Sequence, residues 1–95
     1  MKAVKMRIEG MVQGVGFRYY TYRIAKRYGV RGYVMNMPDG SVEVYAECED
    51  EKKLRDFLSE VARGPSTAVV YNFETEVVEP KGYETFEIEY YGGRW

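Results

Sequence analysis

The sequence contains no histidine and a single cysteine, Cys48, among its 95 residues. The absence of histidine excludes His-based catalytic triads, His metal ligands, phosphohistidine chemistry and the usual proton shuttle near neutral pH. A lone cysteine excludes an internal disulfide framework and a multi-cysteine zinc site, and a cysteine in a strand is expected to pack as a small hydrophobic residue. Any catalysis must therefore use Arg, Asn, Lys, carboxylates, hydroxyl groups or the backbone.

Long hydrophobic runs are also missing. The longest aliphatic runs, such as 68–71, span only a few residues, whereas a membrane helix needs about 20. The N-terminus interleaves Lys5, Arg7 and Glu9 with apolar residues, which is not typical of a signal peptide. An apolar fraction of 45% with recurring periodicity predicts a globular chain. We therefore expect one soluble, cytoplasmic domain over residues 1–95 that binds no membrane and is a monomer.

Side-chain amides are scarce, and the charges are unevenly distributed. Gln13, Asn36 and Asn72 are the only side-chain amides, and such scarcity is typical of thermophilic proteins. The five methionines favour the opposite interpretation. Residues 1–36 carry a net charge of +7 and residues 37–95 a net charge of −8. A basic first third predicts either a local anion site or basic and acidic segments that pair across the fold.

Hydrophobic alternation, helical spacing and turn residues predict the order β-α-β-β-α-β followed by one more strand. The expected strands are 4–8, 30–35, 41–48, 67–78 and 86–90, and the expected helices are 17–28 and the segment between Asp50 and Gly64. This order predicts an α/β sandwich in the split-βαβ arrangement, with two helices on one face of a mostly antiparallel sheet.

The split-βαβ arrangement links two motifs that are distant in the sequence. It makes the first two strands parallel with another strand between them, so their C-terminal ends open onto the same edge of the sheet. The loop 12–17 leaves the first end, and Asn36 stands at the second. We expect these motifs to lie two strand spacings apart, about 10 Å.

The segment Val12-Gln13-Gly14-Val15-Gly16-Phe17-Arg18 has the residues of an anion site. Two glycines in a strand-to-helix turn let successive backbone N–H groups converge, and the helix N-terminus adds partial positive charge. Arg18 adds a planar fork of donors. Taken alone, the loop could equally be an ordinary tight turn, Arg18 a solvated arginine and Asn36 the start of a turn. The segment is neither a P-loop nor a dinucleotide-binding fingerprint.

VQGVGFR, together with Gly32-Tyr33-Val34-Met35-Asn36 and Asp39-Gly40-Ser41-Val42-Glu43, resembles acylphosphatase. Gly64-Pro65 and the closing strand with Phe86 and Ile88 resemble it too, so the resemblance covers essentially the whole chain. It implies a ferredoxin-like fold and a hydrolase that splits acyl phosphates into carboxylate and inorganic phosphate. The implied reaction needs no metal ion, no cofactor, no covalent intermediate and no nucleic acid.

The resemblance also implies roles for individual residues. Arg18 matches the phosphate-binding arginine and Asn36 the asparagine that orients water. The phosphate-binding backbone amides would be those of Gln13, Gly14, Val15, Gly16 and Phe17.

The sequence departs from the family at three places. Tyr33 stands where Trp is commonest, Met11 where a basic or small polar residue is usual, and 47–49 where a Gly is frequent. We expect Tyr33 to change the packing beside Asn36, and with it the substrate preference more than the type of reaction.

Other interpretations remain open at this stage. The chain could be a phosphate- or RNA-binding ferredoxin-like module without hydrolytic activity, although the RNA-recognition signature is absent and acidic residues populate the strands. It also resembles the acylphosphatase-like module of carbamoyl-transfer maturation proteins. We expect the carboxylates of 47–51 to form a solvated strand end and a helix cap rather than a metal site. The sequence does not place the C-terminal segment 92–95 or identify the physiological substrate.

Overall fold

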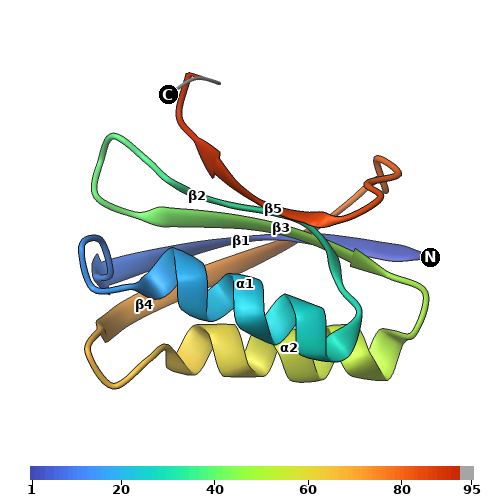
Figure 1. The fold of residues 1–95 in the computed structure, drawn as a ribbon, viewed down its shortest axis with the longest axis horizontal. Helices are drawn as coiled ribbons and strands as arrows, with labels where there is room; N and C mark the ends of the chain where they lie inside the picture. Colours follow the sequence, from blue (N-terminus) through green and yellow to red (C-terminus); the bar gives the residue numbers. More distant parts are fainter. Residues whose placement is uncertain (93–95) are drawn as a thin grey trace.

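The computed structural model describes residues 1–92, which form one five-stranded sheet with two helices on one of its faces (Figure 1). The elements are β1 (Lys2–Met11), α1 (Phe17–Tyr28), β2 (Arg31–Asn36), β3 (Val42–Cys48), α2 (Glu51–Arg63), β4 (Val69–Val78) and β5 (Phe86–Tyr90). The predicted order and ferredoxin-like class with an additional C-terminal strand are confirmed. Of the segment 92–95 that the sequence left unplaced, residues 93–95 lie outside the described part.

The strands lie in the order β4-β1-β3-β2-β5. β1 and β2 both run antiparallel to β3, which lies between them, so they are parallel to each other and end at the same edge. β5 pairs with β2 in parallel, and all other pairs are antiparallel. The expected juxtaposition of the loop after β1 with Asn36 follows from this topology.

β1 is longer than the alternation predicted. The strand continues through Gly10 to Met11 because β4 pairs with it there, with a register shift between Glu9 and Gly10. Gly10 has φ 145°, and a Cβ built on it would lie 2.1 Å from the Val69 carbonyl oxygen. Gly10 therefore lies inside the paired part of β1, at a point where the β4 backbone leaves no room for a side chain.

The main core lies between the sheet and the two helices. Ile8, Val34 and Val44 from the strands are buried with Phe17 of α1 and Phe57 of α2. Both helices have capping residues of the kinds that are preferred at helix ends. Gly29 closes α1 in the left-handed conformation, and the Asp50 carboxylate accepts hydrogen bonds from the backbone N–H groups of 52 and 53 at the start of α2. Cys48 is buried in this core, as expected of a packing residue.

A smaller cluster lies on the opposite face of the sheet. Tyr45 stacks on Tyr33 with ring centroids 5.7 Å apart, and Tyr83 packs against both rings. Glu47 is fully buried beside them, so the expectation that it belongs to a solvated strand end is wrong. The turn between β4 and β5 covers it, and sequence patterning along β3 cannot report this cover.

The Glu47 carboxylate is held by donors from three residues. Its Oε1 accepts hydrogen bonds from the Tyr45 hydroxyl and from the backbone N–H groups of Lys81 (3.0 Å) and Gly82 (3.1 Å). Burial alone would raise its pKa, but these donors outweigh the burial and lower the pKa below its ordinary value. Glu47 therefore ties the β4–β5 turn to the sheet as a carboxylate.

Candidate active site

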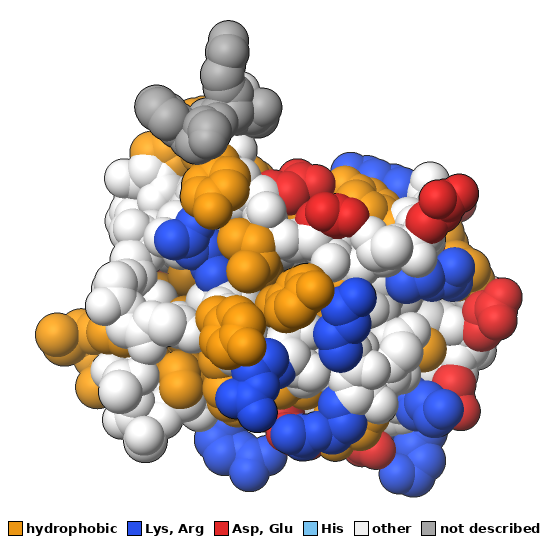
Figure 2. Space-filling model, viewed as in Figure 1, with side chains coloured by type: hydrophobic (Ala, Val, Ile, Leu, Met, Phe, Trp, Pro, Cys, Tyr) orange, Lys and Arg blue, Asp and Glu red, His pale blue; other side chains and the backbone are white. Residues whose placement is uncertain are grey.

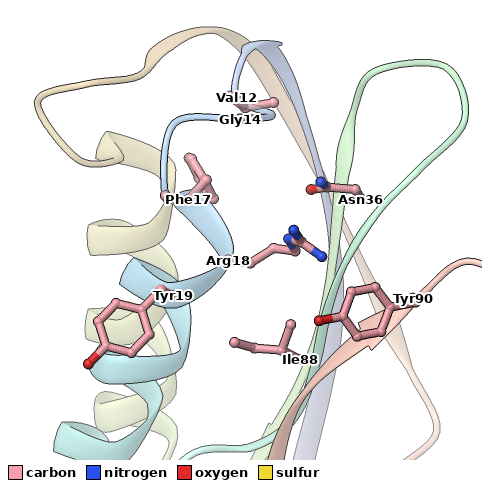
Figure 3. Close-up of a pocket in the computed structure, with 9 residues that line it drawn as sticks. Val12, Gly14, Phe17, Arg18, Tyr19, Asn36, Ile88 and Tyr90 are labelled. Atoms are coloured by element: carbon pink, nitrogen blue, oxygen red, sulfur yellow. The ribbon is translucent and has the colours of Figure 1, made fainter. Parts of the chain in front are cut away.

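A pocket of about 200 Å³ opens at the edge where β1 and β2 end (Figure 3). The residues that line it come from the β1–α1 loop, the first turn of α1, the end of β2, and β5. They are Val12, Gly14, Gly16, Phe17, Arg18, Tyr19, Asn36, Ile88 and Tyr90. The structure thus brings Arg18 and the glycines at 14 and 16 together with Asn36 in one pocket, at the sheet edge where the sequence predicted that they meet.

The loop owes its shape to two glycines in the left-handed region. Gly14 has φ 76° and Gly16 has φ 79°, while a Cβ on either would meet no atom within 4 Å. The glycines are therefore needed for their backbone angles rather than for space. Gly16 is the N-cap of α1 and supplies no side-chain cap. The first N–H groups of the helix consequently remain available to an anion at the pocket.

Gln13 fixes the position of the loop in a way that the sequence analysis missed. Its side-chain Nε2 donates to the carbonyl oxygens of Met37 (2.8 Å) and Ser41 (2.9 Å), which flank the turn between β2 and β3. On the other side, the Thr67 hydroxyl donates to the Val15 carbonyl oxygen at 2.7 Å. Hydrogen bonds thus hold the loop to the β2–β3 turn on one side and to the α2–β4 connection on the other. The sequence marked Gln13 only for its backbone N–H group, and nothing local to it shows which atoms its side chain contacts.

The turn that receives Gln13 is itself held by charge. Asp39 accepts hydrogen bonds from the hydroxyl and the N–H of Ser41, and it forms an ion pair with Arg7. The hydrogen bonds from Ser41, assisted by Arg7, lower the pKa of Asp39 to about 2. Asp39 is therefore ionised at neutral pH and acts as a structural anion rather than a proton donor.

Arg18 lies in the first turn of α1 and reaches across the pocket. Its guanidinium carbon is 5.2 Å from the centroid of the Tyr90 ring, a cation–π contact. Tyr90 belongs to β5 and pairs with Asn36 across the parallel ladder. Tyr90, Ile88 and Tyr19 are site residues that sequence reasoning missed. The pattern predicted the last strand, but nothing local to it showed that it lies next to β2.

Asn36 ends β2 with its side chain directed toward the pocket (Figure 3). Its Oδ1 is buried and has no hydrogen-bond partner among residues 1–92. A buried acceptor without a partner is unfavourable in a folded protein, so this atom is a candidate ligand contact.

Tyr33 does not pack beside Asn36 as expected. Successive strand residues face opposite sides, and Tyr33 belongs to the tyrosine cluster on the face away from the helices. Asn36 instead shares the helix-covered face with Val34. Tyr33 and the pocket therefore lie on opposite faces of the sheet, so Tyr33 could affect substrate preference only through the strands between them.

Residues 1–92 contain neither a cluster of metal-binding side chains nor a helix that could span a membrane. No group of three or more Asp, Glu, Cys or His side chains in this part of the chain is arranged to hold a metal ion. No helix there is both long and apolar enough to cross a membrane.

Proteins with similar sequences belong to the family that the motifs resembled. A sequence model of the acylphosphatase family matches residues 4–88. The acylphosphatase of Thermotoga maritima, a thermophile, is 63% identical over 91 residues, which cover 96% of this chain and 100% of that protein.

Solved structures with the same fold belong to this family or contain a similar part. The crystal structure of acylphosphatase from Bacillus subtilis is 33% identical with a TM-score of 0.90, and covers 95% of this chain and 100% of that one. A crystal structure of full-length HypF in the phosphate- and nucleotide-bound form is 36% identical with a TM-score of 0.79. That match covers 97% of this chain but 12% of HypF. The family match and the full-length relatives together show that the chain belongs to the acylphosphatase family.

Proposed function

We propose that the pocket between the β1–α1 loop and Asn36 hydrolyses acyl phosphates to a carboxylate and inorganic phosphate without a metal ion. The observation that carries the proposal is the convergence of Arg18, the glycine loop and the unpartnered Asn36 Oδ1 on one pocket. Family membership gives the reaction class, and the geometry of the pocket supports the roles proposed here for its residues.

Arg18 and the loop would hold the phosphate. The guanidinium offers several donors in one plane, and the N–H groups of Gln13, Gly14, Val15, Gly16 and Phe17 lie in a loop fastened by hydrogen bonds on both sides. α1 has no acidic residue in its first turn to compete with a bound anion. Because these donors are preorganised, they would stabilise the charge that spreads over the phosphoryl oxygens in the transition state.

Asn36 would orient the attacking water. Its Oδ1 can accept one hydrogen bond from that water, which aims the oxygen lone pair at phosphorus. The new O–P bond forms as the bond between phosphorus and the acyl oxygen breaks, and the electron pair leaves on the carboxylate. The carboxylate is a good leaving group, so no strong acid is required. The proton released by water would pass to an oxygen of the substrate phosphate.

The size of the pocket, the charges on the strands and the cysteine bear on the partners and the compartment of the enzyme. The pocket, of about 200 Å³, is of a size that suits a small-molecule substrate. Acidic side chains on the strands, such as Glu43, Glu74 and Glu87, disfavour nucleic acid on the sheet. The single buried cysteine fits a reducing compartment such as the cytoplasm.

The likeness to part of HypF favours a second candidate, a phosphate-binding module without independent turnover. Hydrolysis of benzoyl phosphate in excess EDTA, by the wild type beside Arg18→Ala, separates the two. We expect turnover that survives EDTA and is abolished in the variant. A well-folded wild type that binds phosphate without turning over benzoyl phosphate would contradict hydrolysis, and turnover that requires a metal ion would contradict the proposed mechanism.

A further inference from the structure

The apolar side chains that the fold leaves exposed are concentrated on β4. Val69, Tyr71, Phe73 and Val77 of this one strand are between 49% and 72% exposed. None of them lines the pocket at the ends of β1 and β2. Single exposed apolar residues are ordinary on a protein surface, but a row of them along one strand is typical of a surface that binds another molecule.

β4 is also an edge strand. It stands at one end of the sheet order, and among residues 1–92 it pairs with β1 alone (Figure 1). Its ten residues span roughly 33 Å, and the backbone N–H and C=O groups on its outer side have no strand to pair with. An extended segment can add to such an edge as a further strand, with affinity from backbone hydrogen bonds and specificity from alternate side chains.

One face of β4 is apolar. Phe73 and Val77 lie opposite Ile8 and Val4 of β1, so they are on the face of the sheet that packs against the helices. On this face a groove of about 480 Å³ lies between α2 and β4, with Phe73 and Leu58 among the residues that line it. The apolar side chains of an added strand would therefore have apolar neighbours here.

The other face of β4 is acidic. Glu74 and Glu76 lie on it, and neither carboxylate forms an ion pair among residues 1–92. Arg7, the β1 residue opposite Glu74, is instead paired with Glu9 and Asp39. Figure 2 shows Lys and Arg side chains gathered over the helices, which cover the opposite face of the sheet. The acidic face of β4 thus offers negative charge to a basic partner.

β1 shows which pattern of residues fits β4. In β1, the apolar residues at 4, 6 and 8 alternate with Lys5 and Arg7. Its apolar side chains share a face with those of β4, and its basic side chains lie opposite Glu74 and Glu76. Because the side chains of β4 stand on its faces, a strand on the outer edge would meet the same two faces.

A second copy of β4 fits this edge less well. In an antiparallel pair of two β4 strands, residues directly opposite each other share a face, so the acidic faces of the two copies would meet. Glu74 and Glu76 would then lie opposite or beside the same carboxylates of the other copy. Like charges opposite each other destabilise a strand pair. The observations therefore favour a basic segment of a different protein over self-association.

We propose that the outer edge of β4 binds an extended segment of a partner protein in which apolar and basic residues alternate. The segment adds to the sheet next to β4, with its apolar residues beside Phe73 and Val77 and its basic residues beside Glu74 and Glu76. β4 contributes no lining residue to the pocket, so this interaction is independent of the proposed hydrolysis.

The test uses a fluorescent peptide with the sequence of residues 2–8, which has the required alternation, and the same peptide with glutamate at its three basic positions. In fluorescence anisotropy, we expect the wild type to bind the basic peptide at least about tenfold more tightly, since attraction is replaced by repulsion at each position. The double variant Glu74→Gln/Glu76→Gln should lose about three- to tenfold in affinity for the basic peptide. Glu74→Lys/Glu76→Lys should reverse the preference.

Glu87→Gln/Glu89→Gln is the matched control. It removes two carboxylates from the same face of the sheet but from β5, at the opposite edge, and should leave peptide binding unchanged. Val77→Ser tests the apolar face and should weaken both peptides by a similar factor, about two- to fivefold. Bound basic peptide should also raise the urea midpoint of the wild type, because a peptide that adds to the folded sheet stabilises it, whereas one that displaces β1 would not.

Several results would overturn the proposal. These are equal affinity for the two peptides, an unchanged affinity in Glu74→Gln/Glu76→Gln, and no binding of the basic peptide up to about 1 mM. A wild type that sediments as a dimer and becomes monomeric in Val77→Lys would show that a second copy occupies the edge instead. Hydrolysis should be unchanged in all the β4 variants, so a failure of this proposal leaves the proposed function standing.

Discussion

Asn36 and Glu47 each bury an oxygen that has no hydrogen-bond partner among residues 1–92, but their surroundings differ. Asn36 Oδ1 belongs to a side chain that lines a pocket. Glu47 Oε2 belongs to a carboxylate whose other oxygen already accepts hydrogen bonds, beneath the β4–β5 turn and beside Tyr45. The difference that separates them is the open space beside Asn36, and we propose only the Asn36 oxygen as a ligand contact for that reason. Glu47 instead belongs to a cluster that holds a turn to the sheet.

The largest effect expected from this comparison is on Asn36→Ala. Without the acceptor, the attacking water is no longer aimed, so kcat should fall by a factor equivalent to about 2–4 kcal/mol. Inhibition by inorganic phosphate should be nearly unchanged, and thermal stability should change little. Asn72→Ala, an exposed amide on β4, is the control and should retain full activity. Equal loss of phosphate affinity in Asn36→Ala and Arg18→Ala would refute the division of roles.

Glu47→Gln should show the reverse pattern. Replacing a buried carboxylate that accepts several hydrogen bonds should lower the free energy of unfolding by about 2 kcal/mol, measured by urea denaturation. kcat at a temperature where the variant is folded should stay near the wild-type value. The exposed Glu49→Gln is the control. A loss of kcat in fully folded Glu47→Gln would show that this cluster supports the site directly.

The pH dependence of stability tests whether Glu47 stabilises the fold as an ionised carboxylate. Because the pKa of its carboxyl is lowered in the folded state, the stabilisation is present above the unfolded pKa, about 4.3. It should be lost as the pH falls below that value toward the folded pKa. The wild type should therefore lose more stability than Glu47→Gln between about pH 5 and pH 3. Parallel curves for the two proteins would show that folding leaves the pKa of Glu47 unchanged, and a wild type that gains stability relative to the variant as the pH falls would show that folding raises it.

The smallest expected effect concerns Tyr90. Tyr90→Leu removes the ring on which the Arg18 guanidinium lies and should weaken phosphate binding by about 0.5–1 kcal/mol, a two- to fivefold rise in the inhibition constant. Tyr90→Phe keeps the ring and should behave like the wild type. If Phe is as defective as Leu, the hydroxyl rather than the ring face matters.

Much of the fold was predictable because the relevant signals are local. Alternation along β3, the Asp50 cap and the closure of α1 by Gly29 all appear within a few residues of sequence. The same holds for the glycines at 14 and 16, whose left-handed angles the loop requires. The meeting of the β1–α1 loop with Asn36 was also predictable, because the element order restricts the topology to a few alternatives.

What could not be predicted depends on contacts between distant segments. Glu47 looked like a solvated residue because nothing in β3 shows that the turn at 81–82 folds over it, 34 and 35 residues later. Tyr33 was expected beside Asn36 because the two are close in sequence, but the alternation of strand side chains separates them onto opposite faces.

The sequence by itself determined the chemistry available to this protein: no histidine, a glycine loop before a basic helix, and an asparagine at the end of a parallel strand. The tertiary structure alone decided which partners complete the site. It placed β5 beside β2, so that Tyr90 meets Arg18, and it brought the Gln13 amide to the β2–β3 turn. The physical reason is that backbone angles and strand faces are encoded over a few residues. Strand order and side-chain contacts depend instead on how the whole chain buries its apolar surface.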